Sequence, residues 1–200
     1  TAPDGIDDGY TMFIVNWPHE FGGHPGGSCE VTEMWACDPA VELALWQYVL
    51  DLDLVDRVRA EQRPPDDPLR MALADQRGYI SKGRFDEQWV RLLHVDAALG
   101  ARSYNPARPA VTVAVSDPLF DRNTGTWRIT ADGAERVSVA ADTAADLTTT
   151  INGISAAYLG GTSWHELWAA GVVQQGRLGA VAEADVLFAS RPLPRCGTFY

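Results

Sequence analysis

The sequence is poor in cysteine, in basic residues and in long apolar runs. Its three cysteines, Cys29, Cys37 and Cys196, are odd in number and irregularly spaced, which argues against a disulfide framework and predicts buried thiols in a reducing, cytoplasmic compartment. No apolar run approaches the ~20 residues that cross a bilayer, so we expect no membrane span. Only 16 Lys and Arg stand against 27 Asp and Glu, for a net charge of −11. This balance argues against nucleic acid as a partner, because phosphate binding needs clustered cations.

The acidic residues are unevenly placed along the chain. Residues 1–95 hold 17 Asp and Glu against 8 Lys and Arg, a net charge of −9, whereas residues 96–200 have a net charge of −2. Two interpretations stay open, a solvated acidic surface and an electrostatic field that attracts a cationic substrate. The chain starts at Thr1 with no signal-peptide or transit-peptide pattern, so we expect this start to be internal to a longer protein.

Several motifs that carry chemistry are missing. The stretch HEFGGH resembles a zinc-binding helix, but His19 and His24 are five residues apart, about 140° around a helix, and prolines and glycines surround them. We therefore predict no metal site. No phosphate loop, dinucleotide fingerprint or nucleophile elbow occurs. The segment Arg122–Trp127 resembles a coenzyme A loop only in part, and its pattern favours a hairpin turn.

Residues 1–95 carry the pattern of an α+β unit. Alternating apolar residues predict strands in GYTMFIVNW and CEVTEMWAC, and Asp38-Pro39 begins a helix whose buried face we expect to hold Val41, Leu45, Tyr48, Leu52 and Val55. A strand in DRVRAEQR and a short helix in DDPLRMALAD follow. We expect the stretch YISKGRFDEQWVRLLHV to form a hairpin that turns at residues 82–86.

Residues 96–200 form a second predicted α+β unit, with a boundary near Val95. A short helix in DAALGARSY precedes three strands, PAVTVAVSD, GTWRITA and RVSVAAD, whose turns at 123–125 and Asp132-Gly133 predict an antiparallel meander. Three helices follow, in ISAAYLGG, SWHELWAAG and AVAEADVLFAS. Ser163 and Glu166 form a capping box, and glycines at 160, 161 and 171 are expected to end helices.

Five stretches resemble the C-terminal half of the Eis (enhanced intracellular survival) acetyltransferases: ALWQYVLDLDLVDRV, RPPDDPLRMALADQR, WVRLLHVDAALGARSY, AAYLGGTSWHELWAAGVV and AEADVLFASRPLPRCGTFY. The resemblance covers essentially the whole chain. It implies that residues 1–95 are the later part of a central, degenerate GNAT-like domain. Residues 96–200 would be a sterol-carrier-protein-like domain, an antiparallel sheet covered by helices. The family also has an N-terminal GNAT domain, which this chain lacks.

The resemblance further implies which domain binds the cofactor and which contributes to the acceptor site. Acetyl-CoA binds to the N-terminal domain in this family, so this chain holds no cofactor-binding residues, in keeping with a strand CEVTEMWAC that enters its helix without glycine-bearing amides. The acceptor is an amine, on a small molecule or a lysine, and the family forms hexamers. By itself the fragment is expected to be inactive.

The chain ends on Phe199 and Tyr200, two aromatic residues beside a bare carboxylate. The resemblance implies that the terminal carboxylate of Tyr200 is the general base, with Phe199 and His94 in the acceptor pocket. The other interpretation is that the two aromatics only cap the core. Phe199 stands where some relatives have an acid, and His94 where a common Arg-Leu-x-Asp-Val pattern has Asp. Both departures argue against a polycationic aminoglycoside as the substrate.

Two alternatives to an acetyltransferase fragment are also consistent with the sequence. The first is a stand-alone binding module in which the sterol-carrier-like unit holds an apolar ligand. The second is a purely structural oligomerisation piece. An acyl-chain tunnel would favour the first alternative, although the bulky side chains of residues 96–200 predict a filled core.

Overall fold

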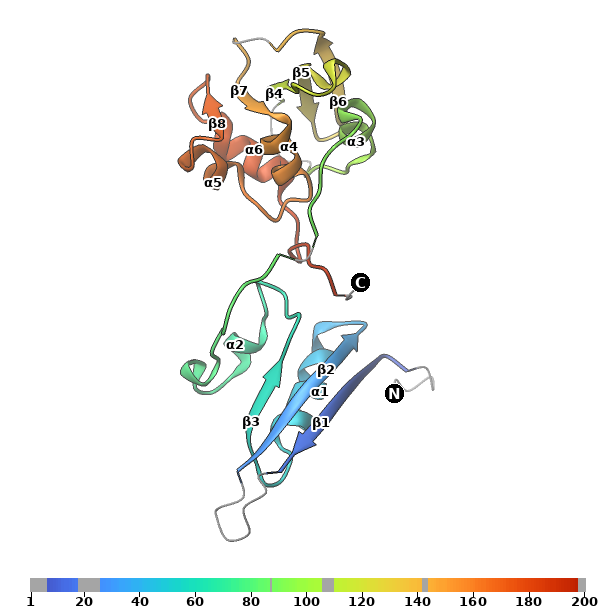
Figure 1. Ribbon diagram of the computed structural model, residues 1–200, viewed down its shortest axis with the longest axis vertical. Coiled ribbons are helices and arrows are strands. Elements are labelled where there is room, and N and C mark those ends of the chain that lie inside the picture. Colours follow the sequence, from blue (N-terminus) through green and yellow to red (C-terminus); the bar gives the residue numbers. More distant parts are fainter. Residues whose placement is uncertain (1–6, 18–25, 87, 106–109, 142–143, 198–200) are drawn as a thin grey trace. The chain divides into compact units, whose positions relative to one another are not determined.

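A computed structural model describes residues 7–17, 26–86, 88–105, 110–141 and 144–197. The chain divides into two compact units: the first comprises the residues up to Phe85 together with Gly197, and the second runs from Asp86 to Cys196. Each unit has its own sheet (Figure 1) and its own buried core. In the described ranges, no helix combines the length and the apolar character that crossing a bilayer requires.

Unit 1 is a three-stranded sheet in the order β1-β2-β3. β1 (Gly9–Asn16) pairs antiparallel with β2 (Gly27–Ala36), and β2 pairs in parallel with β3 (Val55–Ala60). Helix α1 (Pro39–Leu50) connects the two parallel strands, and α2 (Leu69–Ala72) and the 3₁₀ turn η1 (Gln76–Gly78) follow. The predicted order of two strands, a helix, a strand and a short helix is confirmed, whereas η1 was not predicted.

The buried face of α1 differs from the prediction. The helix buries Trp46 and Val49, whereas Tyr48 is 59% exposed. α1 also ends at Leu50, so Leu52 and Val55 lie outside it. Apolar residues occur on every side of this helix, in the sequence PAVELALWQYVL, so their spacing could not single out one face. The prediction of buried thiols is right for Cys29 and wrong for Cys37, which is exposed, and Cys196 is partly exposed.

The hairpin predicted in residues 79–95 is wrong, because the described residues of this stretch contain no strand before α3 begins at Val95. Its apolar side chains do not alternate into a core: Ile80, Phe85 and Trp89 are 67%, 83% and 86% exposed. A two-stranded hairpin without a further sheet to join is marginal in water. The stretch instead runs irregularly from one unit into the next.

Unit 2 contains a five-stranded sheet in the order β6-β5-β4-β7-β8. The predicted meander is present as β4 (Val111–Ser116), β5 (Gly125–Thr130) and β6 (Gly133–Ser138), all antiparallel, with the 3₁₀ turn η2 (Asp121–Asn123) before β5. Two short strands were not predicted. β7 (Leu147–Thr150) joins β4 in parallel, and β8 (Val173–Gln175) pairs with β7.

Four helices pack beside this sheet, α3 (Val95–Ala101), α4 (Ile151–Tyr158), α5 (Trp164–Ala169) and α6 (Ala180–Phe188). α3 lies next to β6, while α4, α5 and α6 contact β7, β8 and β4 respectively (Figure 1). The capping box of Ser163 and Glu166 is confirmed. The largest fully buried side chains are Trp127, Trp164, Leu99, Ile129, Leu147, Ile151, Ile154 and Leu187. The mixed α+β class with two units is therefore as predicted.

Candidate functional site

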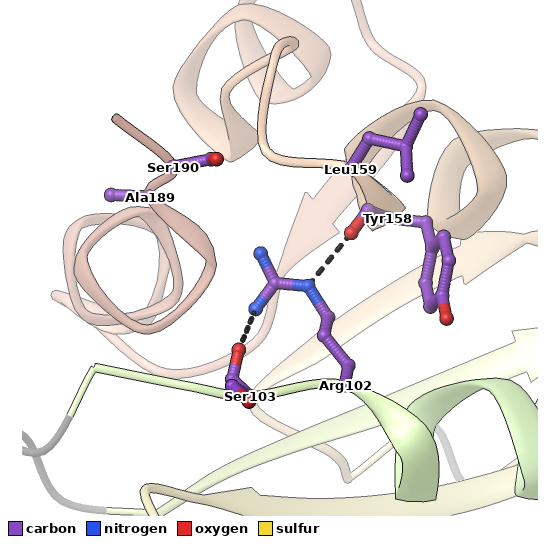
Figure 2. Close-up of a pocket in the computed structure, with 6 residues that line it drawn as sticks. All are labelled: Arg102, Ser103, Tyr158, Leu159, Ala189 and Ser190. Carbon is purple, nitrogen blue, oxygen red and sulfur yellow. Dashed lines mark hydrogen bonds between the residues drawn. The ribbon is translucent and has the colours of Figure 1, made fainter. Parts of the chain in front are cut away.

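The helix ends of unit 2 meet around one side chain, Arg102 (Figure 2). Helix α3 ends at Ala101, and Arg102 is its C-cap residue in an extended conformation. The guanidinium therefore leaves the helix and reaches the last turns of α4 and α6. Helix C-termini leave carbonyl oxygens without intrahelical partners, and a guanidinium offers five donors in a fixed plane.

Arg102 bonds only to backbone carbonyl oxygens in this network. Nε donates to the oxygen of Tyr158 at 2.7 Å, Nη2 to Phe188 at 2.5 Å, and Nη1 to Ser103 at 3.0 Å and to Leu187 at 3.4 Å. The same guanidinium stacks on aromatic faces, with its central carbon 4.5 Å from the ring centroid of Phe188 and 5.0 Å from that of Tyr104. It thus ties α3 to the C-terminal ends of α4 and α6.

The charge of Arg102 is balanced by helix dipoles. Burial lowers the pKa of Arg102 below its usual value, but a guanidinium stays protonated at neutral pH. The C-terminal ends of α4 and α6 both carry partial negative charge at this point. A half-buried cation is therefore stable here on the carbonyl oxygens of two helices.

A second side chain holds the end of α6. Nδ2 of Asn105 donates to the carbonyl oxygens of Val186 at 2.8 Å and Ala189 at 3.0 Å, and its backbone N–H donates to Leu187 at 3.3 Å. Together with Arg102, this amide covers the carbonyls of residues 186–189. The C-terminal tail that leaves α6 therefore starts from a clamped point.

An open pocket of about 270 Å³ lies over this network, lined by Arg102, Ser103, Tyr158, Leu159, Ala189 and Ser190 (Figure 2). Its volume is just below the ~300–1,000 Å³ that is usual for sites of drug-sized ligands. The pocket can admit water or a small polar group beside the helix ends. Its walls are the residues that follow α3, the end of α4 and the first residues after α6.

Of the residues predicted for the acceptor site, the structure describes only His94. His94 is exposed at the N-cap position of α3 and makes no side-chain capping bond there. It is not among the residues that line the pocket. Phe199 and Tyr200 lie outside the described residues, as do His19 and His24. Within the described ranges, no group of three or more His, Cys, Asp or Glu could hold a metal ion.

The loop around His94 is held by a buried acid. Asp117 accepts hydrogen bonds from Arg91 at 2.8 Å and from Asn123 at 2.9 Å, and Asn123 accepts the N–H of Val95 at 3.1 Å. Burial alone would raise the pKa of Asp117. Hydrogen bonds from Asn123, from two backbone amides and from Arg91 outweigh burial and lower that pKa. This network fixes the start of α3 on the sheet.

Among the described residues of unit 1, the N-terminus of α1 after β2 is the expected place for the pyrophosphate of a coenzyme. Its own N-cap occupies that place: Oδ1 of Asp38 accepts the amides of Ala40 at 2.7 Å and Val41 at 3.0 Å. These backbone bonds lower the pKa of Asp38, so the carboxylate is ionised. A negative charge on the first amides of the helix does not fit a second anion, and the residues present do not form a coenzyme A site here.

Comparison with known proteins identifies the domain families to which the two halves of the chain are similar. Residues 95–197 match the sterol carrier protein domain, and residues 1–95 match the acetyltransferase (GNAT) domain. An uncharacterized N-acetyltransferase of Streptomyces avermitilis is 38% identical over 191 residues, 96% of this chain and 46% of that protein. One of Streptomyces coelicolor is 37% identical over 169 residues, 84% of this chain and 40% of that protein. The chain thus spans about half the length of the curated relatives it matches.

A solved structure agrees with both domain matches. The crystal structure of Eis1 from Mycobacterium abscessus is 32% identical and superimposes with a TM-score of 0.86, covering all of this chain and 50% of that one. GCN5-related N-acetyltransferases from other bacteria share the fold at lower identity, 18% for the protein from Anabaena variabilis with a TM-score of 0.67. The chain belongs to the family of the sterol carrier protein domain, here joined to an acetyltransferase (GNAT) domain, and both domains together resemble Eis1.

Proposed function

We propose that this chain is the later half of an acetyl-CoA-dependent N-acetyltransferase of the Eis type, which acts on an amine of a small molecule or a lysine. The observation that carries the proposal is the likeness to Eis1, which extends over the whole chain but only 50% of that structure. In this proposal a preceding GNAT domain binds acetyl-CoA. Hereafter the complete enzyme means this chain together with that domain.

The N-cap of α1 supports the proposal that acetyl-CoA binds to the preceding domain and not to unit 1. Asp38 holds the amides of Ala40 and Val41 and carries a negative charge, so unit 1 is a poor binding site for the pyrophosphate of a coenzyme. A chain that resembles an acetyltransferase and has lost this site needs its cofactor to bind elsewhere. Its own contribution is then to the acceptor side of the reaction.

The terminal carboxylate of Tyr200 is the proposed general base. A terminal carboxylate has a pKa of about 3.5 in water, and partial burial beside aromatic groups raises it toward a more useful value. The carboxylate accepts a proton from the acceptor amine, for which it must lie within hydrogen-bond reach of the nitrogen. The clamp of Arg102 and Asn105 on α6 supports this role, because a base at the end of a tail needs a firm starting point.

Deletion of Tyr200 in the complete enzyme tests the proposal. The new carboxylate is retracted by one residue, about 3.5 Å, which takes it out of hydrogen-bond reach of the amine. General-base catalysis contributes about 10²- to 10⁴-fold, so kcat should fall by that order while the unfolding midpoint changes little. A loss of stability with unchanged kcat would instead assign the two terminal aromatics to packing. We also propose, from the resemblance to the Eis family, that the complete enzyme is a homo-oligomer. Light scattering of the wild-type enzyme tests this, and the mass of a monomer would contradict it.

The match to a sterol carrier protein domain raises a second candidate, a carrier of apolar ligands. The packing of unit 2 argues against it. Trp127, Trp164 and Ile129 are at most 1% exposed, and the pocket over Arg102 is open and partly lined by polar groups. A fatty acid or sterol needs an enclosed apolar space, which these large side chains fill.

A further inference from the structure

The loop between α4 and α5 begins with two adjacent glycines, and the C-terminal tail passes directly over them. Gly160 has a φ of +79°, which favours glycine, and its N–H caps α4 on the oxygen of Ala157. A side-chain carbon at Gly160 would lie 2.3 Å from the carbonyl oxygen of Phe188. Gly160 thus allows the end of α6 to approach the loop.

Gly161 makes the next contact along the tail. A side-chain carbon there would lie 2.8 Å from Cγ and 3.2 Å from Cδ of Pro194, well inside the 3.5–4.0 Å of ordinary carbon contacts. Cγ and Cδ belong to a ring closed on the backbone nitrogen, so they cannot rotate away and the backbone of the tail would have to move. The φ of Gly161, unlike that of Gly160, is not in the left-handed region. Alanine at position 161 is therefore acceptable to the loop itself and acts only on the tail.

We infer that Gly161 is a positioning residue for the C-terminal tail, because the absence of a side chain there lets the ring of Pro194 pack against the loop. We call this contact between Gly161 and Pro194 the seat of the tail. The inference rests on the proposed function of the terminal carboxylate. Arg102 and Asn105 fix the tail as far as Ala189, and the seat fixes it again five residues later. Only the last six residues then lie between the second fixed point and the base, which narrows the positions that the carboxylate can take.

The first test uses the 200-residue chain and trypsin. Trypsin cuts after Arg195 but not after Arg191, which precedes a proline, so intact mass reports the loss of residues 196–200. Cleavage of a native protein follows the population of the open form. Gly161→Ala should accelerate this loss several-fold. Gly100→Ala is the matched control, because a side-chain carbon there meets nothing within 4 Å.

A double-mutant cycle shows whether the effect passes through the proline. In a Pro194→Ala background the ring atoms are gone, so Gly161→Ala should no longer change the cleavage rate. This comparison also covers the case in which Gly161→Ala lowers the unfolding midpoint, because a general loss of stability would persist in that background. If Gly161→Ala still accelerated cleavage in the Pro194→Ala background, the inferred contact between Gly161 and Pro194 would be wrong.

The second test measures turnover in the complete enzyme. The tail must shift by about 1 Å to restore normal contacts, and a misplacement of this size can reduce turnover by up to about 10²-fold. Allowing for slack in six residues, we expect Gly161→Ala to lower kcat by about tenfold, with the KM for acetyl-CoA unchanged and Gly100→Ala at wild-type activity. Wild-type kcat in Gly161→Ala would overturn the inference, whatever the cleavage rate.

The two proposals can fail separately. If deletion of Tyr200 lowers kcat and Gly161→Ala does not, the base stands and the seat has no positioning role. If Gly161→Ala accelerates cleavage but neither change alters kcat, the tail has a seat and the proposed base is wrong, which overturns the positioning role with it.

Discussion

Replacement of Arg102 by leucine should be among the most destabilising single changes in unit 2. The guanidinium bonds to four carbonyl oxygens from three segments of the chain and stacks on two aromatic rings. Leucine keeps part of the apolar stem and removes every one of these bonds. The carbonyls of Tyr158 and Phe188 then lose this partner, whereas that of Leu187 keeps the N–H of Asn105.

The size of the effect follows from the geometry. The pocket is open, so water can rehydrate the freed carbonyls, and we take about 1 kcal/mol for each of four bonds, below the ~1.5–3 kcal/mol typical of bonds to charged groups. The cation–π contacts add about 0.5–1 kcal/mol. Arg102→Leu should therefore lose about 4.5–5 kcal/mol of unfolding free energy. At about 3–4 °C per kcal/mol for a unit of this size, the midpoint falls by more than about 10 °C.

Two variants control the experiment. Arg102→Lys keeps the charge without the planar fork, so we expect about half of the loss. Arg128→Leu removes an arginine whose side chain is 51% exposed and pairs with Glu135 at 3.3 Å, and it should change stability by less than about 1 kcal/mol.

Denaturant unfolding gives the free energy, and hydrogen exchange locates it. The ends of α4 and α6 should exchange faster in Arg102→Leu, whereas α1 of unit 1 should not change. An Arg102→Leu protein within about 0.5 kcal/mol of the wild type would refute the role assigned to this side chain.

Three further outcomes are expected. The 200-residue chain should not bind acetyl-CoA in a calorimetric titration, because Asp38 occupies the amides at the start of α1; a micromolar constant would contradict this. Organic extraction of the purified chain should yield no stoichiometric fatty acid or sterol, and mass spectrometry of the extract would detect one. Burial alone would raise the pKa of Asp146, but hydrogen bonds from Arg177 and Thr112 lower it. The ionised carboxylate therefore stabilises the folded protein above the unfolded-state pKa of about 3.9, and this stabilisation is lost as the pH falls through the lower pKa of the folded state. Urea unfolding at pH 6 and pH 3 should therefore show a smaller pH dependence in Asp146→Asn than in the wild type.

Local signals in the sequence predicted much of the fold. Asp38-Pro39 begins α1 and Ser163 with Glu166 begins α5, because capping depends on residues within one turn. Gly160 and Gly171 have positive φ as expected of helix stops, whereas Gly161 does not. Gly161 lacks a side chain for another reason, the close approach of Pro194.

Features that depend on distant partners were missed or misread. β7 and β8 have four and three residues, and β7 is held by parallel pairing with β4 across more than 30 residues of chain. The stretch from residue 79 has strand-like composition but no sheet to join. Composition describes a strand's surface, whereas pairing decides whether the strand forms.

The clamp around Arg102 left no signal in the sequence for a similar reason. Its acceptors are backbone carbonyls, 56 and 86 residues away at Tyr158 and Phe188. A carbonyl oxygen is present at every residue, so no residue type marks the partner. His94, by contrast, was singled out by a family pattern, and in the structure it is an exposed N-cap without a side-chain bond.

The most direct test of the central claim is the addition of one glycine after Tyr200 in the complete enzyme. This change keeps Phe199 and Tyr200 in place and moves only the terminal charge, by about 3.5 Å. If the carboxylate is the base, kcat should fall by about 10²- to 10⁴-fold, with the unfolding midpoint and the KM for acetyl-CoA unchanged. A glycine-extended enzyme with undiminished kcat would contradict the account.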